Sequence, residues 1–137
     1  MDKGKPFVGR WTYRSFHNDP EPSKEFNVLR FGTGTLVLDE PDYGRLSGSL
    51  GGEGWNLSLV GGYTYGNPFD LRFQGSGDIS GEKWVYDYVG YLVPIWPNGI
   101  DQRPAIVGSV IRTVQHSNGQ ARAGYIASFI AVKQVQG

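Results

Sequence analysis

Residues 45–59 read Arg-Leu-Ser-Gly-Ser-Leu-Gly-Gly-Glu-Gly-Trp-Asn-Leu-Ser-Leu, and this stretch decides the fold. On each side of the glycine-rich segment 51–54, an apolar residue or glycine occupies every second position and a polar residue the positions between. That period of two is typical of an antiparallel strand with one face on a core and the other in water. The stretch therefore predicts two strands joined by a tight turn.

The same pattern continues outward to both ends of the chain, and no amphipathic helix of convincing length interrupts it. The predicted strands are Phe7–Phe16, Phe26–Leu38, Arg45–Leu50, Trp55–Leu59, Phe69–Gln74, Trp84–Val93, Ala105–Val114 and Ala123–Lys133. Eight strands in sequential hairpins most economically close on themselves, because closure removes the exposed edges of the sheet. We predict an all-β fold, an eight-stranded antiparallel up-and-down (meander) β-barrel, as a single domain over residues 1–137. A two-layer sandwich is the alternative.

Composition narrows the classes of partner and compartment. Lys plus Arg and Asp plus Glu number 13 each, so no basic surplus is present to neutralise a phosphate backbone, and we expect no nucleic-acid partner. The absence of cysteine excludes disulfides and thiolate chemistry. No apolar run approaches transmembrane length and the start lacks a signal-peptide pattern, so we expect a cytoplasmic protein with no membrane partner. We expect no cofactor, and two histidines without matching carboxylates predict no metal site.

The last three predicted strands are apolar on both faces. In 84–93, Trp84, Tyr86 and Tyr88 share one face, while Val89 and Tyr91 lie on the other. An antiparallel strand with one face in water should not have this pattern. We therefore expect a homo-oligomer through strands six to eight, with an N-terminal segment or a long loop folded over them as the alternative.

The segment Gly9-Arg10-Trp11-Thr12, at the start of an eight-strand meander, resembles the calycin group of lipocalins and avidins. The resemblance implies that the indole of Trp11 closes one end of the barrel. Residues 46–50, Leu-Ser-Gly-Ser-Leu, are similar to the second hairpin of avidins, but the last strand lacks the Asp that would bind a ureido group, so biotin binding is not implied. Length, glycine content and aromatic residues are also similar to allene oxide cyclase-like barrels. A shared fold does not fix a function.

Several side chains are candidates for a ligand site. Trp84, Tyr86 and Tyr88 would line a cavity if their face points inward, or simply fill the core. The loop 94–104 lies between two strands and is held by three prolines, which favours a pre-shaped lid over the cavity or an oligomer contact. The predicted ligand-binding residues are Tyr13, Trp84, Tyr86, Tyr88, Trp96, Asp101 and Arg103, and no catalytic residue is assigned.

Other polar residues have structural explanations that we prefer. Asp87 lies between valines, and we expect it in a salt bridge with Arg10, Arg14, Arg72 or Arg112 rather than in acid–base chemistry. His17 and His116 are expected to be solvated loop residues.

These observations favour a calycin-like barrel that binds a small, mostly apolar or aromatic molecule in an aromatic-lined cavity roofed by the 94–104 loop. The alternatives are a cyclase- or isomerase-like enzyme, in which Tyr86, Asp87, Arg103 or His17 moves protons, and an accessory module with a filled core. The sequence leaves an enzyme activity open, and we prefer a binding protein to an enzyme.

Overall fold

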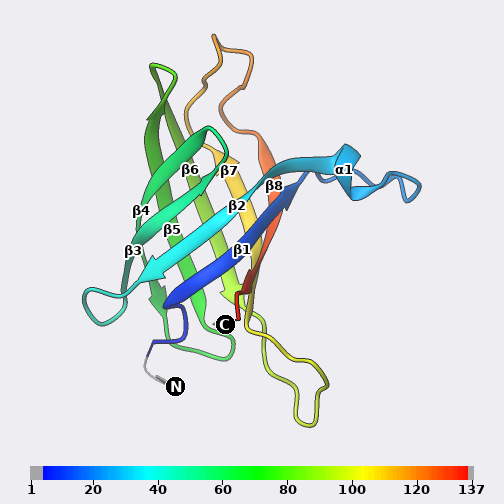
Figure 1. Ribbon diagram of the computed structural model, residues 1–137, viewed down its shortest axis with the longest axis vertical. Helices are drawn as coiled ribbons and strands as arrows, with labels where there is room; N and C mark the ends of the chain where they lie inside the picture. The colour runs from blue at the N-terminus through cyan, green and yellow to red at the C-terminus, as the bar shows by residue number, and fades with distance from the viewer. Residues whose placement is uncertain (1–4, 136–137) are drawn as a thin grey trace.

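The computed structural model describes residues 5–135 and confirms the predicted fold (Figure 1). Each strand pairs antiparallel with the next, and β8 pairs with β1, so the sheet closes into a barrel. The strands are β1 Gly9–Phe16, β2 Arg30–Asp39, β3 Arg45–Gly52, β4 Trp55–Thr64, β5 Asp70–Ile79, β6 Glu82–Leu92, β7 Ala105–Arg112 and β8 Ile126–Lys133.

The alternation seen in the sequence sorts side chains between the barrel interior and its outer surface. In β3 and β4, Leu46, Leu50, Leu57 and Leu59 are all buried inside, as the pattern of 45–59 predicts. Burial of such apolar surface is the dominant favourable term in folding. The interior cluster also includes Leu36, Leu38, Leu71, Phe73, Ile106, Val110, Ala127, Phe129 and Ala131.

Glycines on the inner face let neighbouring strands approach closely. A Cβ atom at Gly61 would lie 2.0 Å from the carbonyl oxygen of Arg72, and one at Gly108 would lie 2.0 Å from that of Val89. Any other residue would force these strands apart. The glycine content therefore serves the tight curvature of the closed sheet.

Several predicted strand boundaries are wrong: β4 and β5 each continue five residues beyond the predicted ends at Leu59 and Gln74, and the second strand starts late. Residues 26–29, expected as the start of a strand, form a single helical turn, α1 Phe26–Leu29. The last pair between β1 and β2 is Phe16 with Arg30, so the residues before Arg30 have no strand to pair with. The N–H groups of Val28 and Leu29 donate instead to the carbonyl of Glu25, and the Leu29 carbonyl accepts from the N–H of His17 at 2.8 Å.

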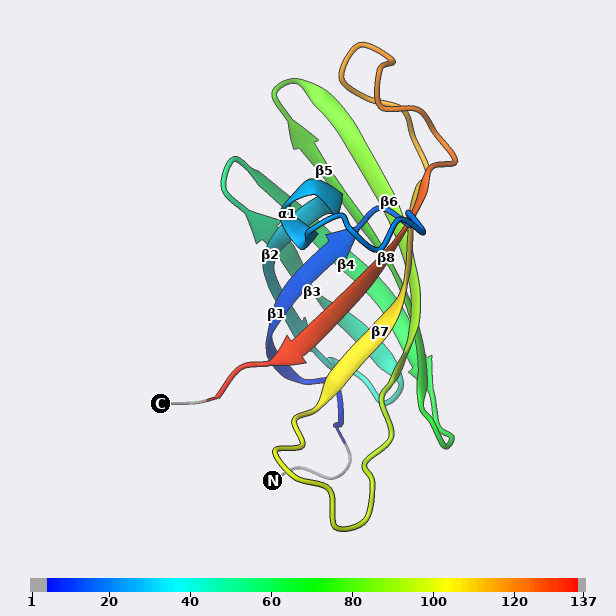
Figure 2. The same ribbon diagram turned by 90° about the vertical axis from the view of Figure 1, so that its right-hand side faces the viewer.

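The segment Ser117-Asn118-Gly119, whose sequence is typical of a tight hairpin turn, does form a turn, but it lies inside a longer connection. Ser117, Asn118 and Gly119 all have positive φ, as expected for a tight turn. However, β7 ends at Arg112 and β8 begins only at Ile126, so this turn does not join the two strands directly. Residues 113–125 form a loop that projects beyond the strands (Figures 1 and 2).

The outer face of β6–β8 is apolar, as the sequence indicates. Val89, Val107, Ile111, Ile130 and Val132 are partly buried in the single chain. On the same face, Tyr91 is 42% exposed and Ile126 is 52% exposed. Self-association through this face stays a prediction, which light scattering of the purified protein tests.

A meander places alternate connections at opposite ends of the barrel. The β2–β3, β4–β5 and β6–β7 connections meet at one end, here called the closed end, together with the start of β1. The β1–β2, β3–β4, β5–β6 and β7–β8 connections meet at the other, here called the open end. Figure 1 shows the loop 93–104 and the loop 113–125 projecting from opposite ends.

Trp11 plugs the closed end. Its side chain is fully buried, and its indole Nε1 donates a hydrogen bond to the carbonyl of Phe7 at 3.0 Å. The Phe7 ring in turn packs against Tyr63 and Phe69, with ring centroids 5.2 and 6.2 Å away. This packing supports the interpretation of Trp11 as a plug rather than a ligand contact.

Candidate functional site

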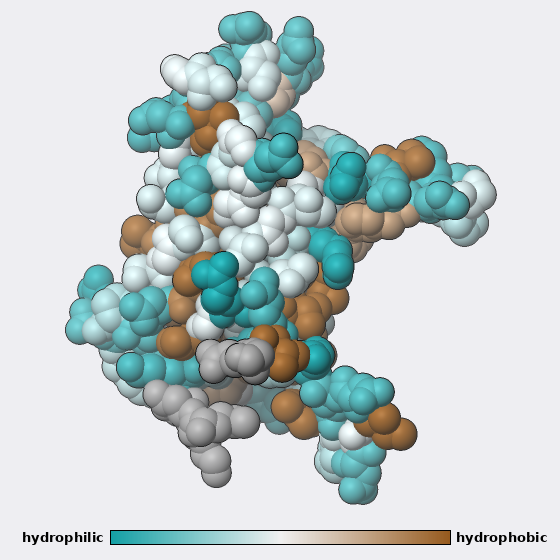
Figure 3. Space-filling model, in the orientation of Figure 1, coloured by the Kyte–Doolittle hydropathy of each residue, from teal (hydrophilic) through white to brown (hydrophobic). Residues whose placement is uncertain are grey.

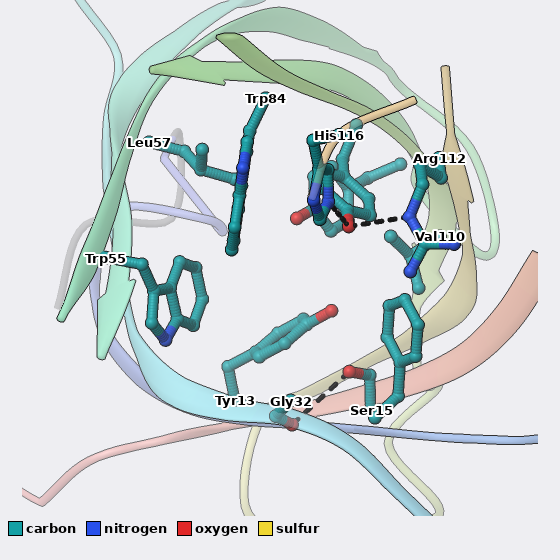
Figure 4. A pocket seen from close by; sticks show the side chains of 12 residues that line it. Tyr13, Ser15, Gly32, Trp55, Leu57, Trp84, Val110, Arg112 and His116 are labelled. Carbon is teal, nitrogen blue, oxygen red and sulfur yellow. Dashed lines mark hydrogen bonds between the residues drawn. The ribbon is translucent and has the colours of Figure 1, made fainter. Parts of the chain in front are cut away.

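The open end of the barrel holds a pocket of about 300 Å³ (Figure 4). It lies above the filled part of the interior, and Trp55 and Trp84 at its walls are only partly buried. Its lining residues are Tyr13, Ser15, Phe31, Gly32, Trp55, Leu57, Trp84, Tyr86, Tyr88, Val110, Arg112 and His116.

Strand parity explains why the lining residues of β1 and β6 converge. Tyr13 and Ser15 follow Trp11 on the inner face of β1, and Ser15 pairs directly with Gly32 of β2. Trp84, Tyr86 and Tyr88 are inward positions of β6 near the open end. Figure 4 shows Trp55 and Tyr13 on the side of the pocket away from His116 and Arg112.

Tyr13 and Tyr88 form the floor of the pocket. Their rings lie 6.2 Å apart, and Tyr88 stacks on Phe73 at 4.7 Å. Burial raises the pKa of both hydroxyls well above the ordinary value of 10.0. Both tyrosines therefore stay protonated near neutral pH and offer the pocket flat apolar area with neutral hydroxyl groups.

A chain of hydrogen bonds forms the polar wall of the pocket. Arg112 Nε donates to the Tyr86 hydroxyl oxygen at 2.9 Å, and that oxygen lies 2.7 Å from His116 Nε2. The single hydroxyl proton of Tyr86 is then free to point at His116, and in the tautomer with an unprotonated Nε2 this atom accepts it. This leaves the imidazole proton on Nδ1, which lies 2.9 Å from the Ser117 hydroxyl oxygen. The geometry thus favours a neutral His116 with its proton on Nδ1.

The surroundings of His116 favour the same neutral form. Its ring is 6% exposed and stacks on Trp84 with centroids 4.0 Å apart. Burial, followed by the Arg112 cation, lowers the pKa of His116 below 6.5, and the Glu82 carboxylate opposes this in part.

This lowered pKa predicts a pH dependence of stability. As pH falls below 6.5, the unfolded chain takes up a proton at residue 116 before the folded protein does. The free energy of unfolding should therefore be highest above pH 6.5 and decrease down to the folded pKa of His116. Urea unfolding at a series of pH values measures this slope. In a His116→Gln variant, the contribution of His116 to this pH dependence should be missing. An unchanged slope in that variant would contradict the lowered pKa of His116.

Aromatic rings surround the guanidinium of Arg112. Its Cζ lies 5.3 Å from the ring centroid of Phe31, 5.7 Å from that of Tyr86 and 5.5 Å from that of Tyr125. The Tyr125 hydroxyl also contacts His17 Nδ1 at the rim of the open end. The cation is thus held by cation–π contacts at the edge of the pocket.

The loop 94–104 does not roof this pocket. Trp96, Asp101 and Arg103 lie on the β6–β7 connection at the closed end, where all three are exposed. The loop is ordered internally, since the Gln102 side chain donates to the carbonyl of Trp96 and accepts from its N–H, both at 2.6 Å. It projects as a separate lobe with hydrophobic residues on its surface (Figure 3). The expectation of a lid is wrong because the sixth connection of a meander falls at the same end as Trp11.

Asp87 lies on the outer face of β6 and forms no salt bridge with any residue in the described range 5–135. Its carboxylate accepts hydrogen bonds from Gln74 Nε2 at 3.0 Å and from the Thr113 hydroxyl. The predicted arginine pairing is therefore wrong. Neutral donors on β5 and in the loop after β7 satisfy the charge instead.

The polar wall was not predicted from the sequence. His116, expected to be solvated, is buried in the pocket, and Arg112 was considered only as a partner for Asp87. The signal for Arg112 was present, because it follows Val110 by two residues and so faces inward. The position of His116 had no local signal, since it depends on the path of the loop 113–125.

No protein-family model, curated protein or solved structure matches this chain. The chemistry of the open end must therefore be read from its own residues. Within residues 5–135, no three His, Asp or Glu side chains lie close enough together to hold a metal ion. No helix in this described part is long and apolar enough to span a membrane.

Proposed function

We propose that this barrel binds a small, largely apolar molecule in the pocket at its open end. The observation that carries the proposal is the contrast between the two ends. Trp11 is fully buried in the barrel interior at the closed end, whereas the interior at the open end has a pocket of about 300 Å³ with aromatic walls. Binding pockets for small molecules are commonly of about 300 Å³ or more, with apolar walls and a few polar groups.

The lining suggests a flat ligand with at least one ring. Trp55, Trp84 and Tyr13 offer broad apolar faces, and the polar groups are confined to the wall of Tyr86, His116 and Arg112. Stacked or edge-to-face contacts between aromatic rings contribute binding energy in addition to that from the apolar area that the rings bury. A ring system lying against the tryptophans would use both features of the pocket.

A calycin-like assignment is supported by the plug and by the meander. Trp11 closes one end of an eight-stranded barrel, as the Gly-x-Trp resemblance implies, and the opposite end is left for a ligand. We include this likeness in the proposal as an architecture, without the biotin specificity of avidins.

The enzyme alternative has less support. Of its four proposed proton carriers, only Tyr86 lines the pocket. Tyr86 and His116 face the space, but each already has hydrogen-bond partners in the protein. The accessory-module alternative requires a filled interior, and the pocket at the open end argues against it.

Titration with 2-naphthamide, a neutral two-ring probe, tests the proposal. We expect quenching of tryptophan fluorescence with a dissociation constant of about 1 mM or lower, since about 13 non-hydrogen atoms at about 0.3 kcal/mol each give about 4 kcal/mol. The absence of saturable binding up to the solubility limit of the probe would contradict the proposed function.

A further inference from the structure

Arg112 carries the only formal charge among the residues that line the pocket. None of the 12 lining residues is acidic, and the geometry favours a neutral His116. Among the residues that the structure describes, the only ion pair joins Lys24 to Asp19, far along the chain from this wall. The pocket therefore presents a positive charge that no carboxylate of the described chain neutralises.

Glu82 and Asp87, the acidic side chains of β6, have hydrogen-bond partners other than Arg112. Both carboxylate oxygens of Glu82 accept backbone hydrogen bonds, from the N–H of Ser117 at 2.6 Å and from that of Asn118 at 3.1 Å. Asp87 points away from the interior and bonds to Gln74 and Thr113. Neither carboxylate is within 4.0 Å of the Arg112 nitrogens.

The guanidinium also has unused hydrogen-bond donors. Of its five N–H groups, two have acceptors within the described part of the chain: Nε–H donates to Tyr86, and Nη1 donates to the carbonyl of Arg122 at 3.2 Å. The surrounding rings of Phe31, Tyr86 and Tyr125 hold the cation in place but accept no conventional hydrogen bond from it. The remaining N–H groups can meet the two oxygens of a carboxylate, the acceptor geometry that a guanidinium matches best.

From this arrangement we propose that the ligand is a ring-bearing carboxylate, with its rings against the tryptophans and its carboxylate on Arg112. The proposal rests on the proposed function and specifies the class of molecule that the pocket takes. A monoanion matches the single cation of the wall. A phosphate monoester would bring a second negative charge into an aromatic pocket that has no further cation to balance it.

A pair of probes with the same rings tests this assignment. At pH 7 and low ionic strength, we expect 2-naphthoate to bind the unmodified protein about tenfold more tightly than 2-naphthamide, because hydrogen bonds to a charged group contribute more than neutral ones. In Arg112→Gln, naphthoate binding should weaken about tenfold, and naphthamide binding should stay within about threefold. Arg112→Lys, which keeps the charge, should retain part of the preference for naphthoate.

Arg14→Gln is the matched control, because Arg14 is an exposed strand residue that does not line the pocket. It should leave the binding of both probes unchanged. Equal binding of acid and amide to the unmodified protein would overturn the carboxylate assignment while leaving the proposed pocket function intact. Tighter binding of 2-naphthyl phosphate than of naphthoate would also overturn the assignment. Failure of naphthamide to show saturable binding would overturn the proposed function as well.

Discussion

Replacing Trp11 with alanine should lower the free energy of unfolding by about 3–5 kcal/mol, the usual cost of removing a fully buried large aromatic side chain. Trp11 is fully buried at the closed end. The truncation would leave a cavity against Phe7 and remove the donor that satisfies the Phe7 carbonyl. Both effects act on the folded state, so the midpoint of urea unfolding should decrease markedly.

Two further variants separate these effects. Trp11→Phe keeps most of the apolar volume and loses the indole N–H, so its cost should be smaller than that of the alanine variant. Trp96→Ala removes the same kind of side chain from the loop at the same end, where Trp96 is 75% exposed, and should change stability by less than about 0.5 kcal/mol. A similar small cost for Trp11→Ala would show that the closed end is not plugged by this residue.

Filling the pocket should abolish most of its binding capacity. Gly32 lies on the inner face of β2, and an added Cβ would meet only the Ser15 hydroxyl oxygen, at 3.4 Å. Gly32→Phe therefore places a ring in the pocket without backbone strain. We expect 2-naphthamide binding to weaken by about tenfold or more, which corresponds to about 1.4 kcal/mol or more. Stability should be maintained, because phenylalanine suits a strand better than glycine.

The neighbouring residue provides the control for this substitution. Thr33 is exposed on the outer face of β2, so Thr33→Phe adds the same side chain outside the barrel. It should leave naphthamide binding unchanged. Equal loss of binding in both variants would indicate a general disturbance of β2, and no loss in Gly32→Phe would place the binding site elsewhere.

The fold could be predicted from the sequence because strand alternation is a local signal. Leu46, Leu50, Leu57 and Leu59 indicate their buried face without knowledge of their partners, and eight such strands close most simply as a meander. Trp11 as a plug also follows from its early position in the first strand. The predicted start of β2 is too early because Phe26, Val28 and Leu29 are typical strand residues, whereas pairing with β1 begins only at Arg30.

The candidate site was predicted in part. Tyr13, Trp84, Tyr86 and Tyr88 all line the pocket, whereas Trp96, Asp101 and Arg103 lie at the closed end. Strand counting alone would have excluded the latter three, since the plug and the sixth connection must share an end.

The polar wall depends on long-range packing that sequence alone does not reveal. His116 reaches the pocket because the start of the loop 113–125 runs beside β6, where Glu82 accepts from the backbone of Ser117 and Asn118. These contacts join residues more than thirty positions apart. No local pattern specifies them.

The four tryptophans of this chain allow the binding site to be located directly. Trp55 and Trp84 line the pocket, Trp11 is buried at the closed end, and Trp96 lies on the loop beyond it. In a nitrogen–proton NMR titration with 2-naphthamide, the indole signals of Trp55 and Trp84 should move in a saturable way, and those of Trp11 and Trp96 should stay in place. Movement of the Trp96 signal alone, or of none of the four, would contradict a ligand site at the open end of the barrel.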